Sequence, residues 1–397
     1  MIERIPTLIL YAKSVPHWRR VVADTLVGGL RLTPDMVPAP LRRSRRVRFL
    51  FAEEYRTLSY LLDWQEAFCE ASSLDECLCN INNLFEYQAA LRTLQRYPLI
   101  VILHSAAGDN MALLRRAASR LKDRRGKLVL FLGNEYNGMP DKIGFARDVA
   151  ADYIASQLPR EAAAWLYAEC GPAKIVEAPP ALNPKLYQPQ TGPRPVDLGF
   201  RGDRYEDRLL GDRDRARMLH AVAERADRWG LVKDMACIRY PRDEWSRFLG
   251  TCKGIVGAES GTAYLERDDR TQEAVKQYLA RRPEAPFEEV FDRFFKPYPH
   301  PVSGKAVSSR HFEPIGTKTC QILLEGRYNG ILQAEEHYIS VKPDLSNLDE
   351  AIRRFKDDAY RQAMVERAYE YVLAGHTYRH RVDRLLRTVV ADGLPSW

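Results

Sequence analysis

One short segment combines a helix start, a cation and a carboxylate in an order that suits a nucleotide. Residues 308–317 read SSRHFEPIGT, and a mostly apolar run follows at 320–324. A serine caps the first turn of a helix, where free N–H groups and the helix dipole favour an anion such as a diphosphate. Glu313, one turn into the helix, can then hold two ribose hydroxyls. The alternative is a capping box that binds nothing, because the same residue types cap ordinary helices.

Two more groups of polar residues follow short apolar runs in the same half of the chain. Residues 259–262, Glu-Ser-Gly-Thr, follow the run 254–257 and can contact a base or a sugar, or form a simple turn. Arg204 follows the run 197–200 and is a second candidate cation for the phosphates, unless it pairs with a neighbouring aspartate. An arginine and fixed N–H dipoles stabilise the charge that builds on a leaving diphosphate without any metal ion.

Three motifs in residues 197–378 carry a resemblance to a known family. SRHFE at 309–313 precedes a small-residue turn and an apolar strand, the run 198–200 leads into a charged turn, and HTYR at 376–379 opens a basic helix. On these motifs the segment resembles the nucleotide-sugar-binding half of a GT-B glycosyltransferase, in the group with the spore-protein-like and "glycosyl transferases group 1" C-terminal domains. The expected donor side consists of Glu313, Ser309, Arg310, Ser308, His311, Arg204, Glu259, Ser260, Gly261 and Thr262.

One departure from that family concerns the first of two glutamates. Retaining enzymes of this type often carry two glutamates eight positions apart, one near the donor sugar and one on the ribose. Eight positions before Glu313 stands Lys305, and eight positions after it stands Gln321. The ribose role is therefore assigned to Glu313 alone, and the stereochemistry of transfer stays open.

Polar residues after apolar runs in the first half of the chain are candidates for the acceptor side. Three loops stand out, at 104–109, 133–137 and 156–157. If the reaction inverts the sugar, His104 or Glu135 can take the proton of the acceptor hydroxyl, and Asp109 is a third candidate for this base. If the reaction retains configuration, no dedicated base is required, and these residues orient the substrate.

The elements that must position these residues alternate between strands and helices. Short apolar runs separated by helical stretches indicate parallel strands that are covered on both faces. The predicted fold is α/β and of GT-B type, with two Rossmann-like domains facing across a cleft. Their expected bounds are 1–190 for the acceptor side and 191–375 for the nucleotide-sugar side, with a helical insertion at 264–298; a last helix at 376–397 is expected to cross back to the first domain. The expected strands are 8–12, 47–52, 99–104, 128–132, 153–156, 175–177, 197–200, 235–238, 254–257 and 320–324.

Charge and composition limit the environment and the partners. The 397 residues carry a net charge of +7 and seven scattered cysteines, and no apolar run approaches the roughly 20 residues that span a bilayer. We therefore expect reduced thiols in a cytoplasmic protein. The basic cluster at 42–48 is either a solvated segment before a strand or a peripheral contact with the inner membrane face. Its arginines are Arg42, Arg43, Arg45, Arg46 and Arg48.

The sequence therefore favours a glycosyltransferase. The expected donor is a nucleoside diphosphate-sugar, and the expected acceptor is a hydroxyl of a glycan, a lipid-linked molecule or a small molecule, with a role in bacterial surface polysaccharide synthesis. No cofactor, metal ion or nucleic acid is expected as a partner. The alternatives are an inactive GT-B scaffold or interaction protein, for which the missing glutamate speaks, and an epimerase or phosphorylase of the same architecture.

Overall fold

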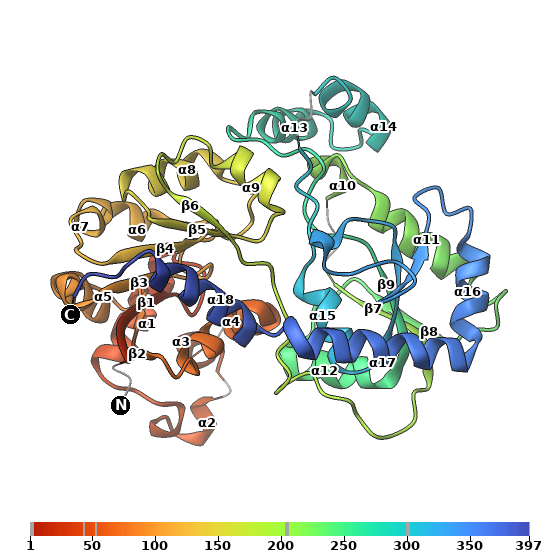
Figure 1. The fold of residues 1–397 in the computed structure, drawn as a ribbon, viewed down its shortest axis with the longest axis horizontal. Helices are drawn as coiled ribbons and strands as arrows, with labels where there is room; N and C mark the ends of the chain where they lie inside the picture. The colour runs from red at the N-terminus through yellow and green to blue at the C-terminus, as the bar shows by residue number, and fades with distance from the viewer. Residues whose placement is uncertain (1–3, 43, 52–53, 203–205, 299–301, 397) are drawn as a thin grey trace. The chain divides into compact units, whose positions relative to one another are not determined.

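The computed structural model describes residues 4–42, 44–51, 54–202, 206–298 and 302–396. These residues form two compact units, each with its own parallel sheet. Unit 1 consists of Met1–Ser156, Tyr167–Glu177 and Val382–Trp397, and unit 2 consists of Gln157–Leu166 and Ala178–Arg381. Figure 1 shows helices packed around both sheets. The predicted α/β class with two Rossmann-like sheets is confirmed.

The sheet of unit 1 has six parallel strands in the order β2-β1-β3-β4-β5-β6. Its central strand β3 is buried along its whole length, as expected for a parallel strand with helices on both faces. The strands are β1 (Ile5–Tyr11), β2 (Leu74–Asn80), β3 (Leu99–Ile102), β4 (Lys127–Phe131), β5 (Tyr153–Ser156) and β6 (Lys174–Glu177). The main helices are α1 (Trp18–Gly29), α2 (Ala39–Arg42), α3 (Arg45–Leu50), α4 (Ser59–Cys69), α5 (Leu84–Arg92), α6 (Ala112–Arg116), α7 (Ala118–Lys122) and α8 (Met139–Asp148).

The prediction of a strand at 47–52 is wrong. Residues 45–50 form helix α3 instead, because Ser44 caps its start by accepting a hydrogen bond from the backbone N–H of Val47. A short apolar run fits either a strand or a helix, and here the cap decides. On its outer side β1 pairs with the edge strand β2, which the sequence did not predict, because β2 mixes acidic residues and cysteines with few large apolar ones.

The sheet of unit 2 has five parallel strands in the order β11-β10-β9-β7-β8. Alternate residues of β10 enter different cores: Ile322 packs with α11, α16 and α17, whereas Leu323 packs with α12, α15 and α17. The strands are β7 (Val196–Arg201), β8 (Lys233–Ala236), β9 (Cys252–Gly257), β10 (Cys320–Leu324) and β11 (Ile339–Val341). The helices are α9 (Arg160–Leu166), α10 (Asp207–Leu210), α11 (Asp214–Arg225), α12 (Arg242–Thr251), α15 (Ser309–Gly316), α16 (Leu348–Lys356) and α17 (Asp358–Gly375).

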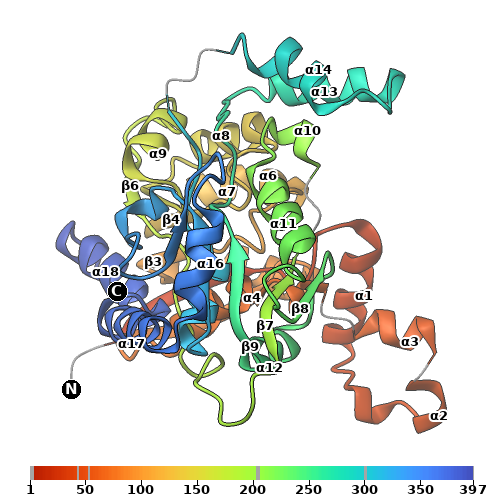
Figure 2. The same cartoon turned by 90° about the vertical axis from the view of Figure 1, so that its right-hand side faces the viewer.

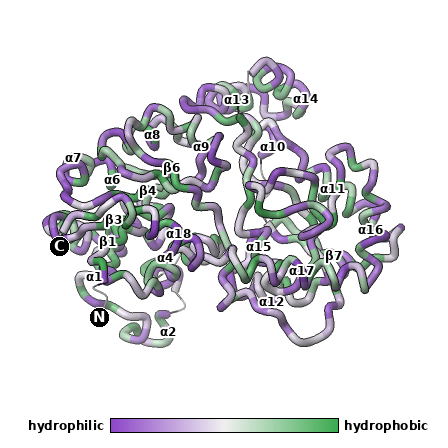
Figure 3. Tube along the Cα trace, in the orientation of Figure 1, coloured by the Kyte–Doolittle hydropathy of each residue, from purple (hydrophilic) through white to green (hydrophobic). Residues whose placement is uncertain are grey.

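Hydropathy follows this layering within each unit. The strands run mainly through hydrophobic stretches of the tube, and the helices alternate between hydrophobic and hydrophilic segments (Figure 3). Between β9 and α15 the chain forms helices α13 (Arg270–Arg281) and α14 (Phe287–Val290), which lie together beyond the edge of the sheet in Figures 1 and 2. They have a small aromatic core of their own, so this insertion is an ordered appendage of unit 2.

Within the first 190 residues, the division into units differs from the expected bounds at Gln157–Leu166, which belongs to unit 2, and after Glu177. The proline-rich stretch after residue 177 belongs to unit 2, because Leu182 and Tyr187 are buried in its core. The last helix, α18 (Tyr378–Ala391), starts in unit 2, and from Val382 onward its residues belong to unit 1. Among the described residues, no helix is long and apolar enough to cross a membrane.

Candidate functional site

Helix α15 begins at the edge of the second sheet where parallel strands end. The imidazole Nε2 of His311 lies 3.1 Å from the carbonyl oxygen of Ala258, directly after β9. The guanidinium of Arg310 donates to the carbonyl of Arg201, the last residue of β7, at 3.4 Å. Ligands of open parallel sheets bind beyond this carboxyl edge, so the first turn of α15 stands where a ligand is expected.

The start of α15 is closed by a reciprocal pair of hydrogen bonds. Nδ1 of His311 accepts from the backbone N–H of Ser308 at 2.9 Å, and the Ser308 side chain caps the backbone of the same turn. Because Nδ1 accepts, the ring proton stands on Nε2 and is donated to Ala258. Burial lowers the pKa of His311 to about 4, so the ring is neutral at pH 7. The partner in this capping box is therefore His311 rather than Glu313.

Glu313 is buried one turn further along the helix, with 1% of its surface exposed. Its Oε2 accepts a hydrogen bond of 2.7 Å from the indole N–H of Trp245 on α12. The guanidinium of Arg310 lies 4.3 Å from the centre of the Trp245 ring, and its Nε lies 3.8 Å from the same carboxylate oxygen. Trp245 thus orders both the predicted ribose ligand and the predicted phosphate ligand, although no sequence pattern pointed to this tryptophan.

Residues 259–262, the four residues that follow Ala258, lie against the segments that flank α15. Burial raises the pKa of Glu259, whose Oε1 accepts from the backbone N–H of Tyr328 at 2.7 Å. Ser260 forms a backbone bridge with Ala306, two residues before the helix cap. Gly261 has φ +86°, and a Cβ there would lie 2.2 Å from the carbonyl of Gly304, so only glycine fits. The turn and its polar side chains are therefore locked beside α15.

Thr262, the last of the four, points away from this turn. Its hydroxyl donates to the carbonyl of Leu210 in α10 at 2.9 Å. The structure therefore brings together Ser308, Ser309, Arg310, His311, Glu313, Glu259, Ser260 and Gly261, with Thr262 at the margin. Arg204 lies outside the described residues.

Two further cations lie at this edge of the sheet, and sequence analysis did not select them as main phosphate ligands. Arg215, on the first turn of α11, donates to the Ser260 hydroxyl at 3.2 Å. Lys305, which stands where the first glutamate of the family pair is expected, forms an ion pair with Asp212. Burial lowers the pKa of Lys305 to about 8, while the aspartate favours the charged form. The sequence feature that could have identified Arg215 is its place at the start of α11, the longer of the two described helices between β7 and β8.

On unit 1, the three candidate bases have different surroundings. His104, directly after β3, is 2% exposed and packs against the rings of Trp64 and Phe131. Neither of its ring nitrogens has a hydrogen-bond partner among the described residues. Burial lowers its pKa to about 3. The ring is therefore a neutral part of an aromatic core.

Glu135 and Asp109 both lie near the ends of β3, β4 and β5 but differ in exposure. Glu135 is 3% exposed, and its Oε1 accepts from the hydroxyls of Ser156 at 2.6 Å and Tyr167 at 2.7 Å. The side chain of Asp109 is 50% exposed and accepts from the amide of Asn134 at 2.9 and 3.1 Å. Of the three, Asp109 is the one that a substrate reaches without displacing packed side chains.

Acid is expected to destabilise the protein partly through His104. Its pKa is about 6.5 in the unfolded chain and about 3 when folded. Between these values the unfolded chain binds a proton that the folded protein does not, so the free energy of unfolding falls by up to about 1.4 kcal/mol per pH unit. Urea unfolding between pH 7 and pH 4 measures this slope. His104→Leu should flatten it, and His220→Gln controls for loss of an exposed histidine; equal slopes in wild type and His104→Leu would contradict the assignment.

Comparisons with known proteins give one family match and several matches to solved structures. Residues 290–387 match the protein family described as "Glycosyl transferase-like". Comparison with curated proteins gives no match. Among solved structures, Anabaena HepE in complex with UDP-glucose is 10% identical at a TM-score of 0.48, covering 98% of this chain and 100% of HepE. Sucrose-phosphate synthase from Thermosynechococcus elongatus is 13% identical at 0.47, and the UDP-forming trehalose-phosphate synthase from Burkholderia vietnamiensis is 14% identical at 0.41, each with 98% and 100% coverage.

The matched segment contains α15 with Arg310 and Glu313, β10 and β11, and the two helices that follow. It therefore confirms the resemblance that the SRHFE motif carried. Residues 290–387 are therefore similar to a glycosyl transferase-like domain, and the part of the candidate donor site on α15 lies within them, whereas Glu259, Ser260 and Gly261 precede them.

Proposed function

We propose that this chain is a GT-B glycosyltransferase that moves a sugar from a nucleoside diphosphate-sugar to an acceptor hydroxyl. The observation that carries the proposal is the first turn of α15 at the carboxyl edge of β9, with Arg310 and Glu313 ordered on Trp245. Free N–H groups at a helix start bind phosphate oxygens, and a carboxylate one turn in accepts hydrogen bonds from ribose hydroxyls. The family match of the same segment supports this reading.

The proposed division of labour on the donor side follows from these positions. Arg310, with the start of α15 at Ser308 and Ser309, holds the diphosphate, and Glu313 holds the ribose. Arg215 adds positive charge beside the same turn, whereas Asp212 balances the charge of Lys305. As the sugar leaves, negative charge grows on the β-phosphate, and fixed cations and N–H dipoles stabilise it. We therefore propose transfer that is independent of a metal ion.

Nucleotide binding tests this proposal directly. Thermal unfolding is followed with UDP, GDP, dTDP, CDP or ADP, with and without EDTA. One nucleotide should stabilise the wild type by about 2.7 kcal/mol at 100 times its Kd, and EDTA should not change the shift. UDP is tested first because it is part of the donor in the HepE complex. If no nucleotide shifted the unfolding temperature, the result would favour the inactive scaffold. The lysine at position 305, where a glutamate is expected, supports that alternative.

The same assay tests Glu313 through a conservative change. Glu313→Gln keeps an oxygen that accepts from Trp245, so the fold is expected to persist, whereas Glu313→Ala leaves a buried indole N–H unpaired at about 1–3 kcal/mol. Loss of the charged acceptor should weaken nucleotide binding about 10- to 100-fold. Asp197→Asn is the matched control, because Asp197 is a partly buried carboxylate at the opposite edge of the same sheet. If the wild type, Glu313→Gln and Asp197→Asn bound the nucleotide equally well, Glu313 would serve only as a structural partner of Trp245.

For the acceptor side, we propose Asp109 as the base of an inverting transfer. Its exposure and its bonds to Asn134 support this choice over His104 and Glu135. Asp109→Asn should lower kcat by about 10²- to 10⁴-fold with little change in donor affinity. His104→Leu should retain most activity. An active Asp109→Asn enzyme whose product retains the donor's configuration would remove the need for a base.

We further propose that the acceptor belongs to bacterial surface polysaccharide synthesis and that the enzyme works in the cytoplasm at the inner membrane face. The basic cluster at 42–48 supports a peripheral contact; Arg43 itself lies outside the described residues. Radiolabelled sugar transferred into a lipid-extractable product, against a water-soluble glycan, distinguishes a lipid-linked acceptor from the others. A protein that turns over only soluble acceptors would contradict the membrane location.

A further inference from the structure

Helix α1 exposes a row of large apolar side chains to solvent. Trp18, Val22 and Leu26, spaced every four residues, are 71%, 50% and 50% exposed. Leu30, which follows the helix, is 65% exposed. Side chains spaced by four lie on one side of a helix, so these residues form a stripe. Exposed apolar side chains that form a continuous patch mark sites that interact with other molecules.

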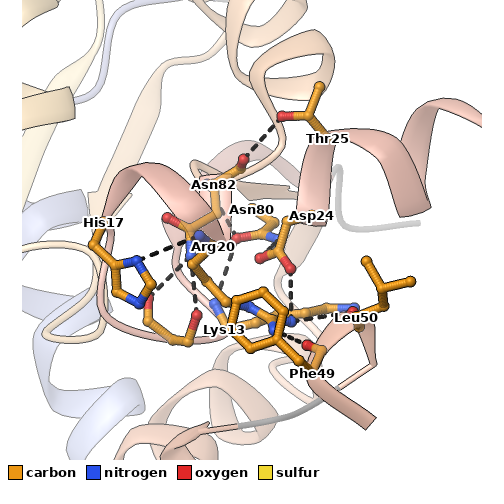
Figure 4. Close-up of polar contacts among 10 residues, drawn as sticks. Lys13, His17, Arg20, Asp24, Thr25, Phe49, Leu50, Asn80 and Asn82 are labelled. Carbon is orange, nitrogen blue, oxygen red and sulfur yellow. Dashed lines mark hydrogen bonds and ion pairs between the residues drawn. The ribbon is translucent and has the colours of Figure 1, made fainter. Parts of the chain in front are cut away.

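The opposite side of α1 fastens it to unit 1 and to helix α3. Arg20 is buried, forms an ion pair of 2.8 Å with Asp24, and donates to the backbone carbonyls of Phe49 and Leu50 at the end of α3. Figure 4 shows this guanidinium between Asp24 and the two carbonyls. Helix α3 lies beside α1 in both ribbon views, and α2 lies beside α3 (Figures 1 and 2). The stripe and the arginines of α3 therefore belong to one packed part of unit 1.

Positive charge is concentrated in this part of the chain. Residues 15–50 contain eight arginines and two aspartates, which amounts to +6 of the net charge of +7 of the whole chain. Both aspartates are already paired, Asp24 with Arg20 and Asp35 with Arg42. The remaining described arginines are exposed, and they are Arg19, Arg31, Arg45, Arg46 and Arg48.

We propose that this surface, the α1–α3 face, binds an anionic lipid bilayer. It is defined by Trp18, Val22, Leu26 and Leu30 with Arg19, Arg45, Arg46 and Arg48. Tryptophan and aliphatic side chains enter the boundary between headgroups and acyl chains, while arginines pair with lipid phosphates. A second copy of the chain is a poor occupant, because a symmetric contact would place the same positive charge on both sides.

The location of the α1–α3 face suggests how membrane contact would serve sugar transfer, and this step rests on the proposed function. Helix α1 follows the carboxyl end of β1 after a six-residue loop, so its first turn stands at the edge of the sheet that also carries Asp109 and Glu135. A bilayer under Trp18 would hold this edge near the headgroups. The contact therefore favours a lipid-linked acceptor over a soluble one.

Vesicle binding by the full chain tests the inference. Sedimentation uses phosphatidylcholine vesicles with and without phosphatidylserine. Arg45→Gln/Arg46→Gln should lower the partition coefficient for phosphatidylserine vesicles about 30-fold, since each basic residue contributes about fivefold. Trp18→Ser should lower it about tenfold or more. The controls are Arg281→Gln/Arg282→Gln at the end of α13 and Ile238→Ser in unit 2, which change exposed side chains elsewhere and should bind like the wild type.

Three results would overturn the inference. These are an absence of vesicle binding, binding that is equal with and without phosphatidylserine, and equal binding by wild type and both face variants. A dimer in light scattering that Trp18→Ser converts to a monomer would assign the stripe to a second copy. Nucleotide-dependent thermal shifts of the face variants separate the two proposals: variants that still bind nucleotide but not vesicles support both, whereas vesicle binding without any nucleotide shift supports the face alone.

Discussion

Arg310→Met is expected to lower the rate of sugar transfer by about 10²- to 10³-fold. The guanidinium stands at the start of α15, stacked on Trp245 and bonded to the carbonyl of Arg201, before any ligand arrives. A charge that is already in place stabilises the leaving diphosphate without reorganisation, and this stabilisation grows as the bond to the sugar breaks. The loss should therefore appear mainly in kcat, with a smaller change in KM.

Lys318→Met provides a matched control for Arg310→Met. Lys318 is also a cation over an aromatic ring, that of Tyr369, but it stands after the C-terminal end of α15 and pairs with Glu366. Initial rates and thermal stability without nucleotide are measured for both variants. Similar rate losses in both, or a rate loss explained by lower stability of Arg310→Met alone, would contradict a role of Arg310 in transfer.

Arg20→Met is expected to destabilise unit 1 by about 3–5 kcal/mol. The change leaves the carboxylate of Asp24 buried without its cation, and it removes both bonds to the end of α3. Such a charge is costly because the side chains of this pair are almost fully buried. Urea unfolding followed by tryptophan fluorescence measures the loss.

The double variant Arg20→Met/Asp24→Leu should recover part of that stability, because no buried charge remains. Arg115→Met removes an exposed ion pair with Asp141 in the same unit and should cost less than about 1 kcal/mol. If Arg20→Met and Arg115→Met were equally stable, the buried pair would contribute little to holding α1 and α3.

The helix that carries Arg310 and Glu313 was predictable from the sequence because its signals are local. The serine cap, the glutamate one turn later and the apolar strand after it all lie within residues 308–324, and helix α15 forms there. The order of short apolar runs likewise predicted most strands. Patterns of this kind need no knowledge of distant contacts.

Features that depend on distant contacts were not predictable. Trp245 donates a hydrogen bond to Glu313, which lies 68 positions away in the sequence. No pattern near either residue predicts this contact. Arg20 looks like a surface residue by type, yet the carbonyls of Phe49 and Leu50 make it a core residue. For the run 47–52, a single cap at Ser44 outweighed strand preference.

The segments that form unit 1 are synthesised at widely separated times. Asp392 of its last segment accepts hydrogen bonds from Tyr153 of β5 and Lys174 of β6, and Val389 of α18 is fully buried. The ribosome must add more than half of the chain between β6 and this segment, which takes roughly 10 to 40 s at 5–20 residues per second. Until then the nascent sheet lacks one of its covers, whereas the bulk of unit 2, from Ala178 to Arg381, emerges as one continuous stretch. The first sheet therefore keeps apolar surface exposed throughout the synthesis of unit 2, which makes this nascent sheet a client for chaperones.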